Sequence, residues 1–196
     1  MTTKHDITHD DIMAMDDYIA ARPARKREIT ELKKNRRVSV GPDATFYFES
    51  YDTMLHQVQE MLYIEKGGDD QIEDELSAYN PLIPNGRELV ATLMFEIDEP
   101  VRREKFLASL GGVEETVTMT LGDETVTAIP EDDIDRTTAD GKASSIQFLH
   151  FPFTVEQVEK FHDPETTVAL GIGHKQYGHM AILPDSVKDA LSTDFD

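Results

Sequence analysis

Histidine and carboxylate side chains at helical spacing are the first features of this sequence that could do chemistry. His56 and Glu60 are four residues apart, with Gln59 between them and Tyr63 one further turn along. Residues four apart share one helix face. The pair could therefore ligate iron, manganese or zinc, or work as an acid–base pair. The alternative is a surface pair that only accepts hydrogen bonds, because two ligands do not make a metal site.

A second group of histidines occurs near the C-terminus. His174 and His179 flank Tyr177 in a predicted hairpin, and His150 belongs to a predicted neighbouring strand. On opposing strands, His174 and His179 could reach one metal ion. The alternative is that they are polar residues of a turn.

Recognised catalytic motifs are absent from the sequence. It contains no Gly-x-Ser-x-Gly or Ser-x-x-Lys set, no phosphate-binding glycine fingerprint, no Walker lysine and no His-Glu-x-x-His, and it lacks the two Glu-x-x-His motifs on paired helices that a di-iron bundle needs. There is no cysteine, which excludes disulfides, thiol nucleophiles and cysteine-ligated zinc or iron–sulfur clusters. Whether the protein is an enzyme is left open by these observations.

The chain is strongly acidic, with 39 acidic and 19 basic residues and a formal net charge of −20. Such a charge repels nucleic acid and anionic lipid. No segment approaches the roughly 18 consecutive apolar residues of a membrane span. The polar N-terminus lacks the apolar core of a signal peptide, so we expect a cytoplasmic protein. The basic residues concentrate between Arg22 and Arg37, either as a solvated helix face or as a docking patch for an anionic partner.

The element that would position His56 is a helix that follows directly on a strand. Apolar residues alternate up to Phe48 and then recur at steps of three and four, which predicts that strand passes to helix at Ser50–Tyr51. The run Leu89–Ile97 is nearly all apolar, which predicts a central strand covered on both faces. Gly122-Asp123 between two alternating runs predicts a β-hairpin.

The pattern as a whole predicts an α+β fold, with a largely antiparallel sheet packed with helices. Residues 1–35 should form a helical arm, with one helix over 7–18 and another starting at Pro23, and residues 36–196 a single domain. Residues 80–86 should form a rigid loop with packed apolar side chains. Residues 130–145 should form a surface loop, and the last five residues should fray.

Three segments resemble a bacterial family known as a domain of unknown function. They are Lys34-Asn35-Arg36-Arg37-Val38 to Gly41-Pro42, Gln57 to Glu65, and Glu75-Leu76-x-x-Tyr79-Asn80-Pro81-Leu82-Ile83-Pro84. The layout from Phe148 to Pro184 is also similar. The resemblance carries no established activity. It implies an accessory role in redox or peroxide metabolism, because genes of the family often neighbour those of a rubrerythrin-like protein and an iron–sulfur oxidoreductase.

Two functional hypotheses follow. The preferred one is a non-catalytic accessory or binding protein with a redox protein partner. Its surface would combine the basic segment, including Arg36 and Arg37, with the central helix and the loop that starts at Tyr79 and Asn80. The other is a metal-binding protein or metal-dependent enzyme that uses His56 and Glu60. A small-molecule site between sheet and helices is also compatible with the sequence, which does not decide the oligomeric state.

Overall fold

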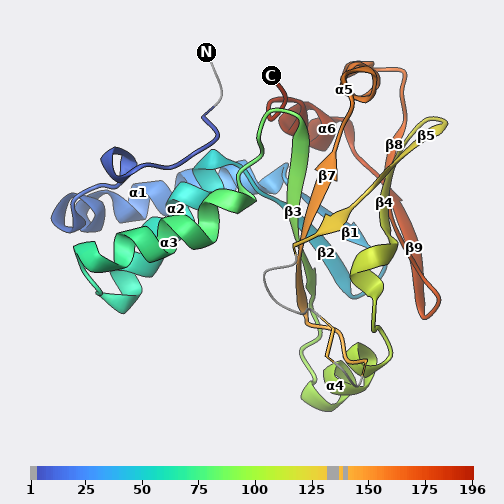
Figure 1. Ribbon diagram of the computed structural model, residues 1–196, viewed down its shortest axis with the longest axis horizontal. Helices are drawn as coiled ribbons and strands as arrows, with labels where there is room; N and C mark the ends of the chain where they lie inside the picture. Colours follow the sequence, from blue (N-terminus) through green and yellow to red (C-terminus); the bar gives the residue numbers. More distant parts are fainter. Residues whose placement is uncertain (1–3, 132–136, 139–140) are drawn as a thin grey trace.

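The computed structural model describes residues 4–131, 137–138 and 141–196, and the predicted α+β class is confirmed. Two antiparallel sheets lie beside a group of three helices (Figure 1). The larger sheet has the order β1 (Arg37–Val40), β2 (Ala44–Phe48), β3 (Glu88–Phe95), β7 (Ile146–Pro152), β6 (Ile129–Pro130). The smaller has the order β5 (Glu124–Thr127), β4 (Val117–Leu121), β8 (Val168–His174), β9 (Tyr177–Ile182).

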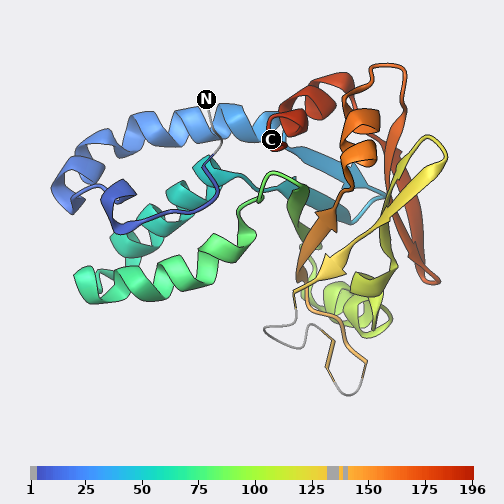
Figure 2. The ribbon, with the colours of Figure 1, turned by 45° about the horizontal axis from the view of Figure 1, so that its top comes forward.

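The helices form separate groups around these sheets. They are α1 (Met15–Lys34), α2 (Tyr51–Glu65), α3 (Ile72–Tyr79), α4 (Pro100–Ala108), α5 (Val155–His162) and α6 (Asp185–Ser192), with short 3-10 helices at His9–Asp11, Asp69–Gln71, Asn80–Leu82 and Val113–Thr116. Helix α2 contacts both α1 and α3, and the three extend together from the larger sheet (Figures 1 and 2). Helices α5 and α6 pack on each other near the C-terminus.

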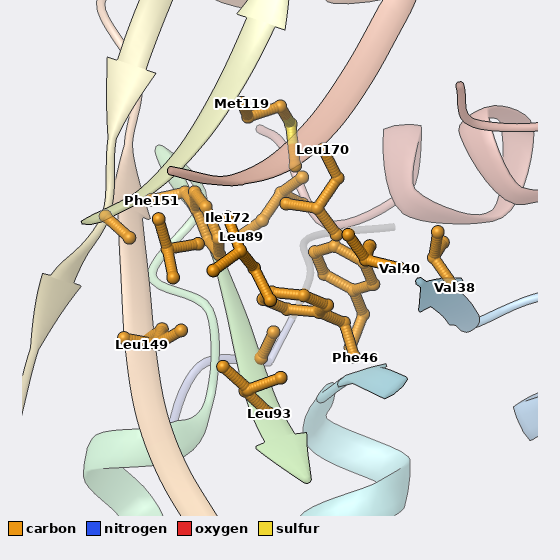
Figure 3. Close-up of a cluster of buried hydrophobic side chains, with 14 of the residues drawn as sticks. Val38, Val40, Phe46, Leu89, Leu93, Met119, Leu149, Phe151, Leu170 and Ile172 are labelled. Carbon is orange, nitrogen blue, oxygen red and sulfur yellow. The ribbon is translucent and has the colours of Figure 1, made fainter. Parts of the chain in front are cut away.

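The main core lies between the two sheets. Figure 3 shows its centre, where Phe46, Leu89 and Phe151 of the larger sheet meet Met119 and Leu170 of the smaller one. Strand β3 also contributes to a second core on its other face, because Val90 packs with apolar residues of α2 and α3. The predicted central strand with both faces covered is therefore confirmed, and it joins the helical layer to the sheets.

The predicted passage from strand to helix is also confirmed, since β2 ends at Phe48 and α2 begins at Tyr51. Ser50 caps the helix by accepting a hydrogen bond from the Thr53 amide, while the Thr53 hydroxyl accepts one from the Ser50 amide. The buried Glu49 carboxylate accepts hydrogen bonds from the hydroxyls of Thr53 and Thr92, and so ties the start of α2 to β3.

Two predictions for the N-terminal region are wrong. Residues 7–18 do not form a helix of their own: Ile7 is buried, and the Asn80 side chain hydrogen-bonds both its amide and its carbonyl. Helix α1 then runs without a break through Pro23. Proline removes one backbone hydrogen bond, but tertiary contacts of Tyr18 and Lys26, on either side of it, hold the helix in place.

The C-terminal tail was expected to fray, and this is wrong as well. The Asp194 carboxylate pairs with the buried Arg36 guanidinium, and the Asp196 amide donates to the Gly86 carbonyl at 3.0 Å. The Phe195 ring lies 4.9 Å from that of Phe153, centroid to centroid. A tail with one aromatic residue among four polar ones gave no local sequence signal for these long-range contacts.

The two predicted loops have different outcomes. Leu82 and Ile83 are buried as expected, although Asn80–Leu82 form a 3-10 turn and not an irregular loop. The loop predicted over 130–145 lies partly outside the described residues. Within the described part, Pro130 belongs to β6 and Ala143 is packed into the main core.

Candidate functional site

A cavity of about 200 Å³ lies between α1 and α2. From α2 it is lined by Asp52, Leu55, His56 and Gln59, whose spacing of three, four and seven places them on one helix face. The other wall comes from the segment before α1 and from α1 itself. Its residues are Asp11, Met13, Tyr18, Arg25, Glu28, Ile29 and Leu32. Only Met13, Ile29, Leu32 and Leu55 among the lining residues are apolar, so this wall is more polar than that of a usual small-molecule site.

Helix α1 is held against α2 by a cluster around Glu60. Arg22 donates two hydrogen bonds to the Glu60 carboxylate, from Nε at 2.7 Å and from Nη2 at 2.8 Å, and the Tyr18 hydroxyl donates a third at 2.6 Å. The Lys26 ammonium lies 3.5 Å from the same carboxylate. The pKa of Glu60 is lowered to about 2, mainly by the hydrogen bonds from Arg22. Glu60 therefore stays ionised and fixes one wall of the cavity.

Gln59 has one half of its amide satisfied and the other half free. Gln59 is only 3% exposed. Its side-chain Oε1 accepts a hydrogen bond of 2.7 Å from the Met13 amide. Its Nε2 is buried and has no hydrogen-bond partner among the residues that the structure describes. Because buried polar atoms are nearly always hydrogen-bonded, this donor lacks a partner that a water molecule or a ligand group could supply.

His56, another residue of the lining, also has an unsatisfied buried atom. Its Nδ1 has no hydrogen-bond partner in the described part of the chain. Burial is the main cause that lowers the pKa of the imidazole. The Glu60 carboxylate is the next influence and opposes it, while the charges of Lys33, Lys26 and Arg22 lower the pKa further. The ring is therefore neutral at pH 7, and in its Nε2–H tautomer the free Nδ1 is a hydrogen-bond acceptor.

Three charged side chains of the cavity wall are exposed at its rim. Arg25, Glu28 and Asp52 form no ion pair with any residue in the described part of the chain, although Arg25 contacts the Met13 thioether at 3.6 Å. Asp11, by contrast, is paired with Lys4, and the hydrogen bond from that ammonium strongly lowers its pKa. As far as the described residues show, the rim thus offers one unpaired cation, Arg25, and two unpaired carboxylates, Glu28 and Asp52.

Of the four candidate residues that the sequence indicated on α2, two line the cavity and two lie beside it. His56 and Gln59 line the cavity, whereas Glu60 is bound to Tyr18 and Arg22 beside it. The Tyr63 ring supports this cluster, with the Arg22 guanidinium 4.3 Å from its centroid.

The other predicted binding residues lie elsewhere. Arg36 is buried, and its guanidinium donates to the carbonyls of Phe48, Glu49 and Ala190 in addition to Asp194. Arg37 is exposed at the start of β1. Asn80 holds the N-terminal segment at Ile7, and the Tyr79 hydroxyl accepts a weak hydrogen bond from Gln57 at 3.4 Å.

The C-terminal histidines lie on the hairpin of β8 and β9. In the register of these two strands, His174 lies opposite Tyr177 and His179 lies opposite Ile172. The His174 Nδ1 accepts a hydrogen bond from the Gln176 amide, and the His179 ring lies on the Tyr177 ring at 4.4 Å between centroids. Across the described residues, no group of three or more histidine, aspartate or glutamate side chains is arranged to hold a metal ion.

The α1 wall of the cavity was missed in the sequence. Arg25, Glu28, Ile29 and Leu32 follow helical spacing, but the run of basic residues around them indicates a solvated face. Their role in lining a cavity depends on the position of α2, which no local pattern encodes.

Comparisons with known proteins agree with this fold. A family model described as "Protein of unknown function (DUF3501)" matches residues 6–195. A crystal structure of a novel protein of unknown function from Burkholderia pseudomallei K96243 is 33% identical in sequence, with a TM-score of 0.90 over 97% of this chain and 99% of that chain. No curated protein matches this sequence. No helix among the described residues is long and apolar enough to cross a membrane.

Proposed function

Because the chain belongs to the DUF3501 family of proteins of unknown function, we propose a function from the geometry of its cavity. The protein acts as a non-catalytic binding protein, and the cavity between α1 and α2 is its site for a small polar ligand. At about 200 Å³, the cavity exceeds the roughly 150 Å³ that accommodates benzene. The ligand is therefore a small metabolite and not a nucleotide-sized cofactor.

The observation that carries this proposal is that two lining residues, Gln59 and His56, each have a buried side-chain atom, Nε2 and Nδ1, without a hydrogen-bond partner among the described residues. A buried donor or acceptor without a partner costs about 1–3 kcal/mol. A ligand that supplies an acceptor to the first atom and a donor to the second removes this cost. Binding then gains stability that the free protein lacks.

The chemistry of the wall favours binding over catalysis. The described lining residues include no serine, threonine, cysteine or lysine that could act as a nucleophile. Two carboxylates lie one turn from His56 on α2. That of Glu60 already accepts hydrogen bonds from Arg22 and Tyr18, and that of Asp52 forms no hydrogen bond with the imidazole Nδ1 among the described residues. Neither therefore orients the imidazole as a general base.

The proposal is tested with a library of small carboxylic acids, amines and amino acids, ranked by the thermal stabilisation of the protein and then by calorimetric titration. Gln59→Glu keeps an oxygen for the Met13 amide but replaces the free donor with an acceptor. We expect at least about a tenfold loss of affinity, as for the loss of one hydrogen bond in a buried site. Gln57→Glu, two residues away on the same helix and outside the cavity lining, is the matched control and should bind normally.

Binding that is equally strong in the wild type and Gln59→Glu would place the ligand elsewhere and refute the assignment. So would the absence of any binder in the library when the folded wild type is confirmed by circular dichroism.

The accessory role in redox or peroxide metabolism, and with it a metal- or cluster-containing partner protein, extends this proposal and is supported by the sequence resemblance. A chain without cysteine would supply binding and not the redox centre. The metal-site alternative on α2 predicts stoichiometric iron, manganese or zinc in protein purified without a histidine tag. Elemental analysis decides it, and loss of that metal in His56→Ala would identify the ligand.

A further inference from the structure

Strand β9 forms an open edge of the smaller sheet. Leu183, directly after this strand, donates a backbone hydrogen bond to Val168 of β8, so the odd-numbered residues of β9 face β8. The amides and carbonyls of Gly178, Met180 and Ile182 therefore point to the opposite side, where no described strand pairs with them. This edge presents a row of backbone donors and acceptors that a further strand can pair with.

The other sheet edges carry features that β9 lacks. Edge strands are commonly kept from pairing with other chains by charged side chains or proline. Among the described strands, β1 carries Arg37, β5 carries Glu124 and β6 carries Pro130, whereas Tyr177–Ile182 contains no acidic residue, lysine, arginine or proline. In a chain with a formal net charge of −20, two copies can meet at such an edge without the repulsion that their acidic surfaces cause elsewhere.

The outer face of β9 is apolar and exposed. Met180 is 65% exposed and Ile182 is 68% exposed, which are the highest values among the large hydrophobic side chains of the described residues. The inner face is occupied instead, because the Tyr177 hydroxyl donates to the Val40 carbonyl and the His179 ring lies on the Tyr177 ring. Contacts with β1 are thus made by the inner face, and the apolar outer face has no cover.

The sequence of β9 is self-complementary for antiparallel pairing across a two-fold axis at Met180. In that register Met180 meets its own counterpart, and Ile182 of one copy lies opposite Gly178 of the other on the same face. The glycine leaves room for the isoleucine side chain. The backbone groups that point to the open edge then form three residue pairs, each of which exchanges two hydrogen bonds.

The same register matches the charged residues that flank β9. Lys175 lies five residues before Met180 and Asp185 lies five residues after it, so Lys175 of each copy comes to the level of Asp185 of the other. Both residues are exposed, and neither forms an ion pair with any residue that the structure describes. Opposite charges at both ends of the paired strands favour this antiparallel alignment.

We propose that the protein forms a two-fold symmetric dimer by antiparallel pairing of β9 with β9 of a second copy. The two four-stranded sheets join into one continuous sheet, and the Met180 and Ile182 side chains of both copies pack together on its outer face. Figure 1 shows β9 at the opposite end of the molecule from α1 and α2, so this interface is independent of the proposed ligand site.

The first test is sedimentation equilibrium of the full-length protein over about 1–500 μM. An interface of one strand from each copy is small, so we expect a dissociation constant of about 1–100 μM. Met180→Lys brings two like charges together at the axis and should weaken the dimer at least about tenfold. Ile64→Lys makes the same kind of change at a side chain of α2 that is 62% exposed, and this matched control should dimerise normally.

The second test uses single cysteines to report the register, since the chain has none of its own. Opposite Cα atoms of an antiparallel hydrogen-bonded pair are about 5.5 Å apart, within the roughly 4.4–6.8 Å that a disulfide spans. Under mild oxidation, Met180→Cys should therefore form disulfide-linked dimers at least about tenfold faster than Ile182→Cys. In the proposed register the two copies of position 182 are offset by four residues, about 13 Å along the strand.

Three results would overturn the proposal. The first is a wild type that stays monomeric up to about 500 μM, well above the expected range. The second is a Met180→Lys variant that dimerises as tightly as wild type, or no more weakly than Ile64→Lys. The third is equal cross-linking of Met180→Cys and Ile182→Cys, which would contradict the two-fold register. Circular dichroism spectra that match wild type confirm that these substitutions at exposed positions leave the fold intact.

Discussion

Replacing Glu60 with glutamine should loosen α1 from α2 without removing any side-chain volume. The pKa of Glu60 falls from an ordinary 4.5 to about 2 in the folded protein. At 1.36 kcal/mol per pKa unit this corresponds to ~3 kcal/mol. Water reaches the pair, since the side chains of Arg22 and Glu60 are 26% and 12% exposed, and screening reduces the expected loss in Glu60→Gln to ~1–2 kcal/mol at pH 7.

The pH dependence of this loss follows from the direction of the shift. A lowered folded-state pKa means that the ionised carboxylate stabilises the fold fully above pH 4.5, and that this contribution is lost as the pH falls from 4.5 towards about 2. The difference in free energy of unfolding between wild type and Glu60→Gln should therefore be constant from pH 7 to pH 5 and shrink below pH 4.5.

Urea denaturation followed by circular dichroism at pH 7, 5, 4 and 3 measures this difference. Glu73→Gln, at an exposed position of α3, controls for the loss of one negative charge and should change stability by less than about 0.5 kcal/mol. A Glu60→Gln variant as stable as wild type at pH 7, or a difference that does not shrink on acidification, would refute the argument that an ionised Glu60 holds α1.

Three further predictions concern the rest of the fold. Gly41→Ala would place a Cβ 2.6 Å from a histidine ring of β9, at a residue whose φ is +74°. It should lower the melting temperature more than Gly122→Ala, because φ at Gly122 is a similar +62° but the space around it is open. Equal losses in the two variants would refute the steric clash at Gly41. Asp194→Asn removes the charge that pairs with the buried Arg36, and chemical denaturation should show a loss of about 3–5 kcal/mol; a loss below about 1 kcal/mol would contradict it. The pKa of His150 is raised by its hydrogen bond to the glutamate at the start of β3, so this histidine stabilises the fold below pH 6.5 and loses that effect as the pH rises through its folded pKa. An NMR titration of its imidazole should give a midpoint above 6.5, and a midpoint at or below this value would be the contrary result.

The strand that joins the two cores was predictable because its composition encodes its surroundings. Leu89–Ile97 is apolar on both faces, and the structure covers both faces of β3. The passage from strand to helix at Ser50 was predictable for a similar reason, since the change of period and the capping residues are local signals.

Features that depend on distant contacts could not be predicted in this way. Pro23 is a local signal for a helix start, but contacts of α1 with Glu60 outweigh it. Arg36 belongs to a run of exposed basic residues in the sequence, yet its partner Asp194 is supplied by the opposite end of the chain.

The candidate site contains residues that local sequence signals could indicate and residues that only distant contacts bring into place. His56 and Gln59 could be selected from their residue types and their position beside the apolar stripe of a helix, and the structure places both in the cavity wall. The charged residues of α1 that complete the wall carry no signal of their own. Their function depends on where α2 lies, and that position is set by the contacts of Glu60.

The most direct measurement of the central claim is NMR observation of the Gln59 side-chain amide and the methyl groups of Leu32 and Leu55 during titration with a ligand of the library. Binding in the α1–α2 cavity predicts that these signals shift together and saturate at one dissociation constant. Saturable shifts confined to residues outside the cavity wall, with these three side chains unchanged, would contradict the assignment of the site.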